Sequence, residues 1–191
     1  MKIGLYFGSF NPVHVAHLII ANHVLNETDI EKVWLVVSPQ NPFKQENSLL
    51  NEYHRLHLVR TATEEDNRIK ASDIEFALPK PSYTVNTLTY LAEKHPEHQF
   101  AIIMGSDSFQ KLYKWKNYEE ILRKYKIFVY PRPGITETPF DKHPAVNFVN
   151  APLMDISSTF IRKAIKEKKD VRFYLHQNVW QCIQESGFYN K

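Results

Sequence analysis

The sequence predicts an α/β protein whose sheet is largely parallel. Apolar, β-branched runs alternate along the chain with segments of helical periodicity. The predicted strands are Lys2–Phe7, Lys32–Val37, Phe100–Met104, Lys126–Tyr130 and Val146–Val149. The predicted helices are Val15–Asn26, Tyr53–Thr63, Thr84–Lys94, Tyr118–Lys124, Ser158–Lys168 and Leu175–Ser186. We therefore expect a doubly wound sheet with helices on both faces and a ligand site at the carboxyl ends of its strands.

A second observation supports the helices: they carry apolar stripes and end signals. The stripes are Leu56, Val59 and Thr63 in the second helix, Val85, Leu88 and Ala92 in the third, and Phe160, Ile161, Ala164 and Ile165 in the fifth. Pro96 follows the third helix as a stop signal, and Gly187 follows the last helix as a C-cap.

The composition is that of an ordinary globular protein. The chain has 191 residues, of which 43% are hydrophobic and 24% are charged. This length supports one sizeable core, so we expect a single domain over residues 1–191. The proline-rich segment 131–144 is interpreted as a surface excursion and not as a linker, because a single strand separates it from the next motif.

Charge and apolar patterning exclude several classes of protein. The formal net charge of +3 is too small to indicate a nucleic-acid binder, although it suits an anionic substrate. The single cysteine, Cys182, is expected to be a reduced, half-buried thiol. No apolar stretch reaches the length of a membrane helix, and the N-terminal sequence lacks the features of a signal peptide. We expect a cytoplasmic protein without a membrane partner, and a homo-oligomer stays open.

The first chemical motif runs from Gly8 to Leu18, where the first strand turns into the first helix. Gly8 lets a ligand approach the backbone, and the helix N-terminus offers N–H groups to phosphate. His14 and His17 are three residues apart, so both imidazoles can face one anion and stabilise a transferring phosphoryl group. For either histidine alone, an ordinary surface residue is the alternative. A zinc site is a weaker interpretation, because no third ligand is evident.

A second motif, Ile156–Arg162, has the pattern of a capped helix start. Its hydroxyl residues cap the helix and leave N–H and hydroxyl groups for phosphate oxygens. Arg162 follows one turn later with a guanidinium suited to the same oxygens. Taken alone, the segment is equally an ordinary amphipathic helix.

Together the two motifs resemble the signatures of the nucleotidylyltransferase superfamily. The first is Gly8-Ser9-Phe10-Asn11-Pro12-x-His14-x-Ala16-His17, with alanine where glycine is usual, and the second is Ile-Ser-Ser-Thr-x-Ile-Arg, in the expected order. The resemblance implies a Rossmann-like fold that binds a nucleoside triphosphate.

Segments between the two motifs are similar to the nicotinate-mononucleotide adenylyltransferase family. They are Pro81–Leu88, Gly105–Phe109, Trp115–Leu122 and Tyr130–Gly134. A further segment, Asn41–Lys44, has phenylalanine where the family has histidine, so only Lys44 carries over. The resemblance covers residues 2 to about 165.

The chemistry of the residues agrees with the resemblance. Asp107 follows a predicted strand, where its carboxylate can accept hydrogen bonds from a ribose or, as the alternative, cap a helix. Trp115 stands between two lysines, which is unusual for a core residue, and its indole can stack on a cationic pyridinium ring. Tyr83 and Thr84 begin a helix and can offer N–H groups to a carboxylate. Arg55 is interpreted as a surface charge, with ligand contact as the lesser alternative.

The resemblance then implies a site. Charge stabilisation falls to His14, His17, Lys44 and Arg162. ATP binding falls to Gly8, Ser9, Phe10, His14, His17, Gly105, Asp107, Ser158, Thr159 and Arg162. Mononucleotide binding falls to Lys44, Tyr83, Thr84, Trp115 and Arg132.

The implied reaction joins ATP and nicotinate mononucleotide into deamido-NAD and releases pyrophosphate. Mg²⁺ is expected to bridge the phosphates, held by nucleotide oxygens and water, because the sequence shows no acidic metal-binding cluster. One alternative is another acceptor, such as nicotinamide mononucleotide or phosphopantetheine. From a different class, a non-catalytic module that senses NAD or ATP is the rival, and an RNA-binding module is more distant.

Overall fold

The computed structural model describes residues 1–40, 49–134 and 138–190. A six-stranded sheet forms its centre, with the order β3-β2-β1-β4-β5-β6 and every neighbouring pair parallel. The strands are β1 (Lys2–Gly8), β2 (Lys32–Val37), β3 (Ile69–Ser72), β4 (Gln99–Gly105), β5 (Lys126–Tyr130) and β6 (Val146–Phe148). This strand order is that of dinucleotide-binding folds, which confirms the predicted doubly wound sheet.

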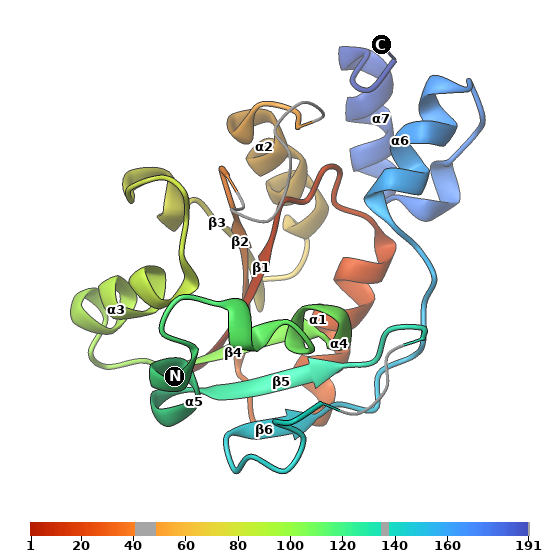
Figure 1. Ribbon diagram of the computed structural model, residues 1–191. Coiled ribbons are helices and arrows are strands. Elements are labelled where there is room, and N and C mark those ends of the chain that lie inside the picture. The colour runs from red at the N-terminus through yellow and green to blue at the C-terminus, as the bar shows by residue number, and fades with distance from the viewer. Residues whose placement is uncertain (41–48, 135–137, 191) are drawn as a thin grey trace.

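Helices cover both faces of the sheet (Figure 1). They are α1 (Val15–Glu27), α2 (Glu52–Thr63), α3 (Thr84–Lys94), α4 (Ser106–Phe109), α5 (Tyr118–Lys124), α6 (Ser158–Lys166) and α7 (Gln177–Ser186). Three short 3₁₀ turns complete the described elements, at Ile74–Ala77, Leu112–Lys114 and Arg172–Tyr174.

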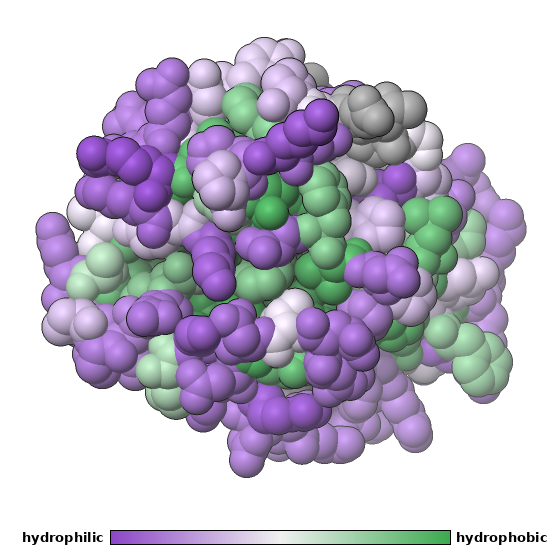
Figure 2. All heavy atoms as spheres, turned by 90° about the horizontal axis from the view of Figure 1, so that it is seen from below, coloured by the Kyte–Doolittle hydropathy of each residue, from purple (hydrophilic) through white to green (hydrophobic). Residues whose placement is uncertain are grey.

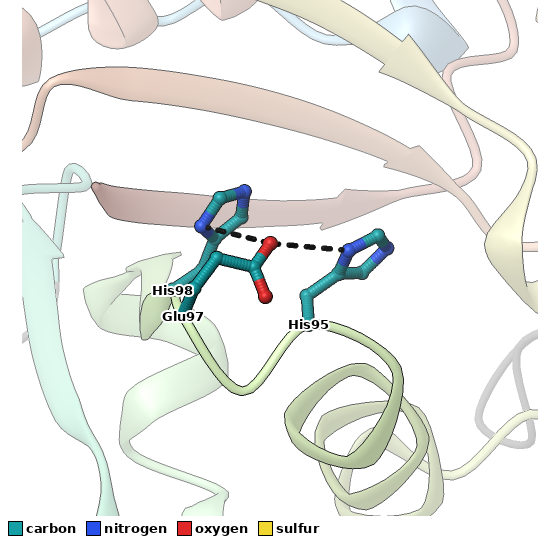
Figure 3. Close-up of side chains that lie close together, drawn as sticks. All are labelled: His95, Glu97 and His98. Atoms are coloured by element: carbon teal, nitrogen blue, oxygen red, sulfur yellow. Dashed lines mark ion pairs between the residues drawn. The ribbon is translucent and has the colours of Figure 1, made fainter.

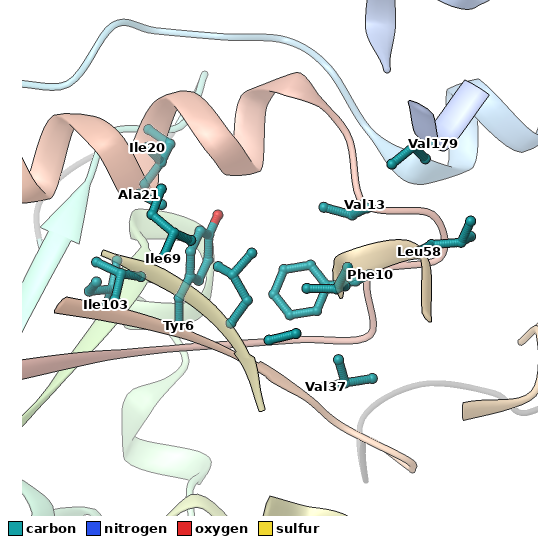
Figure 4. Packing of buried hydrophobic residues seen from close by; sticks show 14 of the residues in the cluster. Tyr6, Phe10, Val13, Ile20, Ala21, Val37, Leu58, Ile69, Ile103 and Val179 are labelled. Atoms are coloured by element: carbon teal, nitrogen blue, oxygen red, sulfur yellow. The ribbon is translucent and has the colours of Figure 1, made fainter. Parts of the chain in front are cut away.

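The sheet separates two apolar clusters, because successive side chains of a strand point to opposite faces. On β1, Leu5 packs with α3 and α5, whereas Tyr6 packs with α1 and α2. Figure 4 shows part of the second group, in which Phe10 lies among Tyr6, Val13 and Val37. On the face shown in Figure 2, hydrophilic side chains predominate and apolar ones appear in smaller areas between them.

Three details differ from the sequence-based prediction. Strand β3 was not predicted, because its four residues include the exposed Lys70 and do not form an apolar run. In α3, Leu91 takes the buried position that we expected for Ala92, which is exposed. In α6, Phe160 is 48% exposed, so the buried stripe there consists of Ile161, Ala164 and Ile165.

Two further expectations are met. Cys182 is half-buried and unpaired. Within the described ranges, no helix is both long and apolar enough to cross a bilayer.

Candidate active site

The site lies where β1 and β4 end side by side, since the strand order reverses direction between these two strands. β1 leads through a tight loop into α1, whose N-cap is His14. Within this loop Phe10 has a φ of 45° and turns its ring into the core, where it is 2% exposed. A Cβ at Gly8 would lie 2.9 Å from that ring. Glycine at this position is therefore also required for packing against the Phe10 ring, and its predicted role in ligand approach stays a prediction.

The burial of Phe10 also limits its predicted role in ATP binding. Its side chain is buried in the apolar cluster, so only its backbone is available for contact with a nucleotide. Ser9 is 5% exposed, and its carbonyl oxygen accepts a hydrogen bond from Arg55 at 2.6 Å. The two residues shape the loop that carries the histidines.

The two predicted histidines are brought together. Their ring centroids are 3.8 Å apart and the rings are tilted by 30°. The backbone N–H of His14 donates to Nδ1 of His17 at 3.1 Å, so the proton of a neutral His17 resides on Nε2. The first turn of α1 thus fixes the tautomer of His17 and leaves Nε2–H as its donor.

His14 is 2% exposed, and this burial determines its charge. Burial, with a smaller contribution from the positive charge of Arg132, lowers the pKa of His14 from 6.5 to about 3. The side chain is therefore neutral at pH 7. In the absence of nucleotide it acts as a hydrogen-bonding imidazole and not as a cation.

The shifted pKa of His14 predicts a loss of stability in acid. The unfolded chain binds a proton at His14 below pH 6.5, whereas the folded chain does so only near pH 3, so the stability falls as the pH drops through this window. Between pH 7.5 and 5 we expect His14 to account for a loss of about 2 kcal/mol. Urea unfolding of the protein and of His14→Gln at both pH values measures this share. An equal acid loss in the variant would contradict the assignment.

The second motif reaches the same loop, as expected. Ser157 caps α6 by accepting the Phe160 N–H at 3.2 Å. The Ser158 hydroxyl donates to the Pro12 carbonyl at 2.9 Å, and Arg162 Nη1 donates to the Asn11 carbonyl at 2.8 Å. The Ser158 proton is thus engaged within the protein and not free for phosphate. Arg162 retains further N–H groups, one of which lies 3.5 Å from the hydroxyl of the exposed Thr159.

Arg55 is not the surface charge that the sequence suggested. It is 1% exposed, and its guanidinium donates to four carbonyl oxygens, those of Ser9, Ser38, Pro39 and Leu50, at 2.6 to 3.2 Å. These carbonyls belong to the loop after β1 and to the chain that follows β2. Arg55 therefore holds these two segments of the site in place from the interior of the protein. The signal that we overlooked is its position four residues before the buried Val59, because residues with this spacing lie on the same face of a helix.

At the end of β4, Asp107 and Arg132 face each other. Asp107 is exposed at the start of α4, and its Oδ1 lies 3.8 Å from Arg132 Nε. Arg132 also donates its backbone N–H to Ser106 Oγ at 2.9 Å. A Cβ at Gly105 would lie 2.5 Å from Asp107 Oδ1 and 3.1 to 3.2 Å from the side chains of Tyr130 and Arg132, so a larger residue would displace the Asp107 carboxylate. Asp107 stands at the carboxyl edge of the sheet as predicted.

A pocket of about 120 Å³ opens beside Gly8 and Gly105. It is comparable to cavities that hold one benzene ring, which are about 150 Å³. Tyr83, Thr84 and the half-buried Trp115 line it, so the structure brings these three predicted residues together. Arg132 does not line it, because the short connection after β5 holds Arg132 against α4. Its predicted contact with the mononucleotide stays a prediction.

Two charged residues that line the pocket were missed by the sequence analysis. Lys116 extends over the Tyr83 ring, with Nζ 4.8 Å from the centroid, and Glu75 is 1% exposed. Lys116 was visible only as a neighbour of Trp115, and Glu75 carried no motif. Lys44, a predicted phosphate-binding residue, lies outside the described residues.

One cluster with metal-ligating side chains lies elsewhere. His95, Glu97 and His98 come together just before β4, where Glu97 Oε1 is 3.6 Å from Nδ1 of His95 and 3.4 Å from Nδ1 of His98 (Figure 3). β4 has seven residues, so this cluster is roughly 20 Å from Gly105 at the other end of the strand. It is not part of the site at the strand carboxyl ends.

Comparison with known proteins identifies the class and then the family. Residues 5–164 match the cytidylyltransferase-like family. Within that class the chain belongs to the nicotinate-nucleotide adenylyltransferase family. It is 51% identical to a probable nicotinate-nucleotide adenylyltransferase of Flavobacterium psychrophilum, over 100% of both chains. It is 48% identical to one of Cytophaga hutchinsonii, over 100% of this chain and 99% of the relative.

A solved structure agrees in fold. Plasmodium falciparum nicotinic acid mononucleotide adenylyltransferase, complexed with NaAD, superposes with a TM-score of 0.84 over 99% of this chain and 97% of that chain. The identity is 22%, so this likeness supports the fold alone.

Proposed function

We propose that the protein transfers the adenylyl group of ATP to nicotinate mononucleotide, giving deamido-NAD and pyrophosphate. The observation that carries this function is a ring-sized pocket that opens directly beside the loop bearing the paired histidines. Its relatives are named as probable nicotinate-nucleotide adenylyltransferases, and the substrates of that reaction contain an aromatic ring and phosphate groups. The protein acts as a single domain, and we place it in the cytoplasm, where ATP is supplied.

In this reaction a 5′-phosphate oxygen of the mononucleotide attacks the α-phosphorus of ATP. A new phosphorus–oxygen bond forms, the bond to the β-phosphate bridging oxygen breaks, and pyrophosphate leaves. Catalysis consists of positioning and of stabilising negative charge, so no side chain becomes covalently attached. His17 Nε2–H and Arg162 donate to the phosphate oxygens, and Lys44 is proposed to act with them.

Different residues hold the pyridinium ring and the ribose of ATP. Trp115 stacks on the pyridinium ring, while Tyr83 and Thr84 offer N–H groups from the start of α3, where no side chain of the described residues caps the helix. Asp107 accepts hydrogen bonds from the ribose of ATP.

Mg²⁺ is proposed as the accompanying cation. Asp107, the exposed carboxylate at the strand ends, lies beside Arg132 and is a weak anchor for a cation, so nucleotide oxygens and water would supply most ligands. When bound, Mg²⁺ neutralises charge on the triphosphate and on the leaving pyrophosphate.

Direct transfer predicts an initial-rate pattern. Both substrates must be bound at once, so double-reciprocal plots at several fixed concentrations of the second substrate should intersect. The measurement follows pyrophosphate release while ATP and nicotinate mononucleotide are varied. Parallel lines, or an adenylylated protein that can be isolated, would instead indicate covalent catalysis.

The pocket also predicts a preference for nicotinate over nicotinamide. Backbone N–H groups pair with both oxygens of a carboxylate, whereas an amide places its own N–H₂ against one donor and leaves it unpaired. We expect kcat/KM to favour nicotinate mononucleotide by about tenfold or more at saturating ATP. Equal use of the two acceptors would refute recognition of the carboxylate, while leaving adenylyl transfer intact.

Trp115→Ala separates stacking from recognition of the substituent. The variant should bind both mononucleotides more weakly by a similar factor, because stacking does not depend on the substituent. Tyr113→Ala, at an exposed aromatic two residues earlier, is the matched control. Since Trp115 lines the pocket and Tyr113 does not, an equal loss in both variants would count against stacking.

A further inference from the structure

The ring-sized pocket contains a buried acid whose role the reaction scheme above does not use. Glu75 lies on the 3₁₀ turn Ile74–Ala77 and is 1% exposed. It lines the pocket together with Ser82, Tyr83 and Trp115. A carboxyl group this far from water is rare, and it costs free energy unless its oxygens are paired.

Among the described residues, only one oxygen of Glu75 has a hydrogen-bond partner. Oε1 accepts a hydrogen bond from the Thr87 hydroxyl at 2.9 Å, and Thr87 is fully buried in the first turn of α3. In the part of the chain that the structure describes, Oε2 of Glu75 has no hydrogen-bond partner, and neither does the Ser82 hydroxyl. Glu75 is thus held in place through Oε1. Its other oxygen, Oε2, has no partner among the described residues, and Glu75 lines the pocket.

Burial favours the neutral form of this acid and raises the pKa of Glu75. The nearby hydroxyl groups of Ser38, Thr87 and Ser82 oppose this shift, and among the described residues only the Thr87 hydroxyl has the geometry of a hydrogen bond to the carboxyl group. Lys116, the cation that lines the same pocket, extends over the Tyr83 ring. In a neutral carboxyl group, one oxygen accepts and the other carries a proton. The observed bond fits Oε1 as the acceptor and Oε2 as the donor.

We propose that Glu75 is a specificity-determining residue that donates a hydrogen bond from Oε2 to the carboxylate of nicotinate mononucleotide. This inference rests on the function proposed above. Because the pocket has the size of one ring, the substituent of a bound ring contacts the residues that line the pocket, and Glu75 is one of these residues. A bond to a carboxylate is charge-assisted and about twice as strong as the same bond to a neutral amide, so Glu75 favours nicotinate.

Two substitutions test the donor. Glu75→Gln keeps the shape, an acceptor for Thr87 and a donor toward the ligand, so kcat/KM for nicotinate mononucleotide should stay within about threefold. Glu75→Met keeps the length but has no donor. It should raise the KM for nicotinate mononucleotide by about 10–100-fold, with kcat and the KM for ATP changed by less than about threefold. The preference for nicotinate over nicotinamide should fall by about tenfold in Glu75→Met alone.

Glu93→Met, at an exposed glutamate of α3, is the matched control and should behave as the unaltered protein. If Glu75→Gln loses as much as Glu75→Met, a carboxylate acceptor is required and the donor assignment is wrong. If Glu75→Met leaves the preference unchanged, Glu75 has only a structural role. Should Glu75→Met fail to fold, the Gln variant decides: a retained preference supports the proposal, and a shift toward nicotinamide overturns it. Absence of any dinucleotide from the unaltered protein would instead refute the proposed function.

Discussion

Replacing His17 or Arg162 with alanine should lower kcat by about 10²–10³-fold, as the loss of one preorganised donor typically does. Both side chains lie at the loop after β1, where His17 is oriented by the His14 N–H and Arg162 by the Asn11 carbonyl. Both side chains are half-buried, and the His17 ring lies at the margin of the core with its edge near Phe10 and Tyr6, so the fold should persist. Steady-state kinetics with circular dichroism on each variant measures both properties.

The control for Arg162→Ala is Lys163→Ala on the same helix. Lys163 is highly exposed, with a side chain 77% accessible, and its nearest acidic partner is Glu167 at 3.9 Å. It should retain normal kcat. An Arg162 or His17 variant that is as active as this control would remove the residue from the mechanism.

Replacing Arg55 with methionine should destabilise the protein by about 3–5 kcal/mol, because the buried carbonyls that it satisfies would lose their donor. Urea unfolding followed by circular dichroism gives the change. Activity should also fall in the folded fraction, since the Ser9 carbonyl would no longer be fixed.

Arg60→Met is the matched control, because Arg60 lies on the same helix with a side chain that is 60% exposed and pairs with Asp73 at 3.2 Å. An exposed pair of this kind is worth less than about 1 kcal/mol. Similar losses in the two variants would show that the four bonds of Arg55 do not stabilise the site.

The sequence predicted most of the sheet and the meeting of the two motifs, because long apolar strands and short functional strings are local features. It could not predict β3, whose pairing depends on β2 more than on its own four residues. It also misjudged Arg55, since an arginine is normally exposed and its burial becomes favourable only through carbonyl groups that are mostly distant in sequence.

The residues of the candidate site also divide into those that the sequence predicted and those that it did not. Tyr83, Thr84 and Trp115 were predicted together and share one pocket. Glu75 belongs to no recognisable motif. Its proposed role follows from two structural observations, its place in the lining of the pocket and an oxygen without a partner among the described residues. Arg132 lies against α4 and does not line this pocket, because its position depends on contacts with α4 and not on its own motif.

The most direct test follows a label on the α-phosphate of ATP into the product. The protein is incubated with Mg²⁺, nicotinate mononucleotide and ATP labelled at the α-phosphate, and the products are separated. Adenylyl transfer predicts that the α-label appears in deamido-NAD and that one pyrophosphate is released for each dinucleotide. Label that stays in ATP, becomes attached to the protein, or leaves as free AMP without dinucleotide would contradict the account.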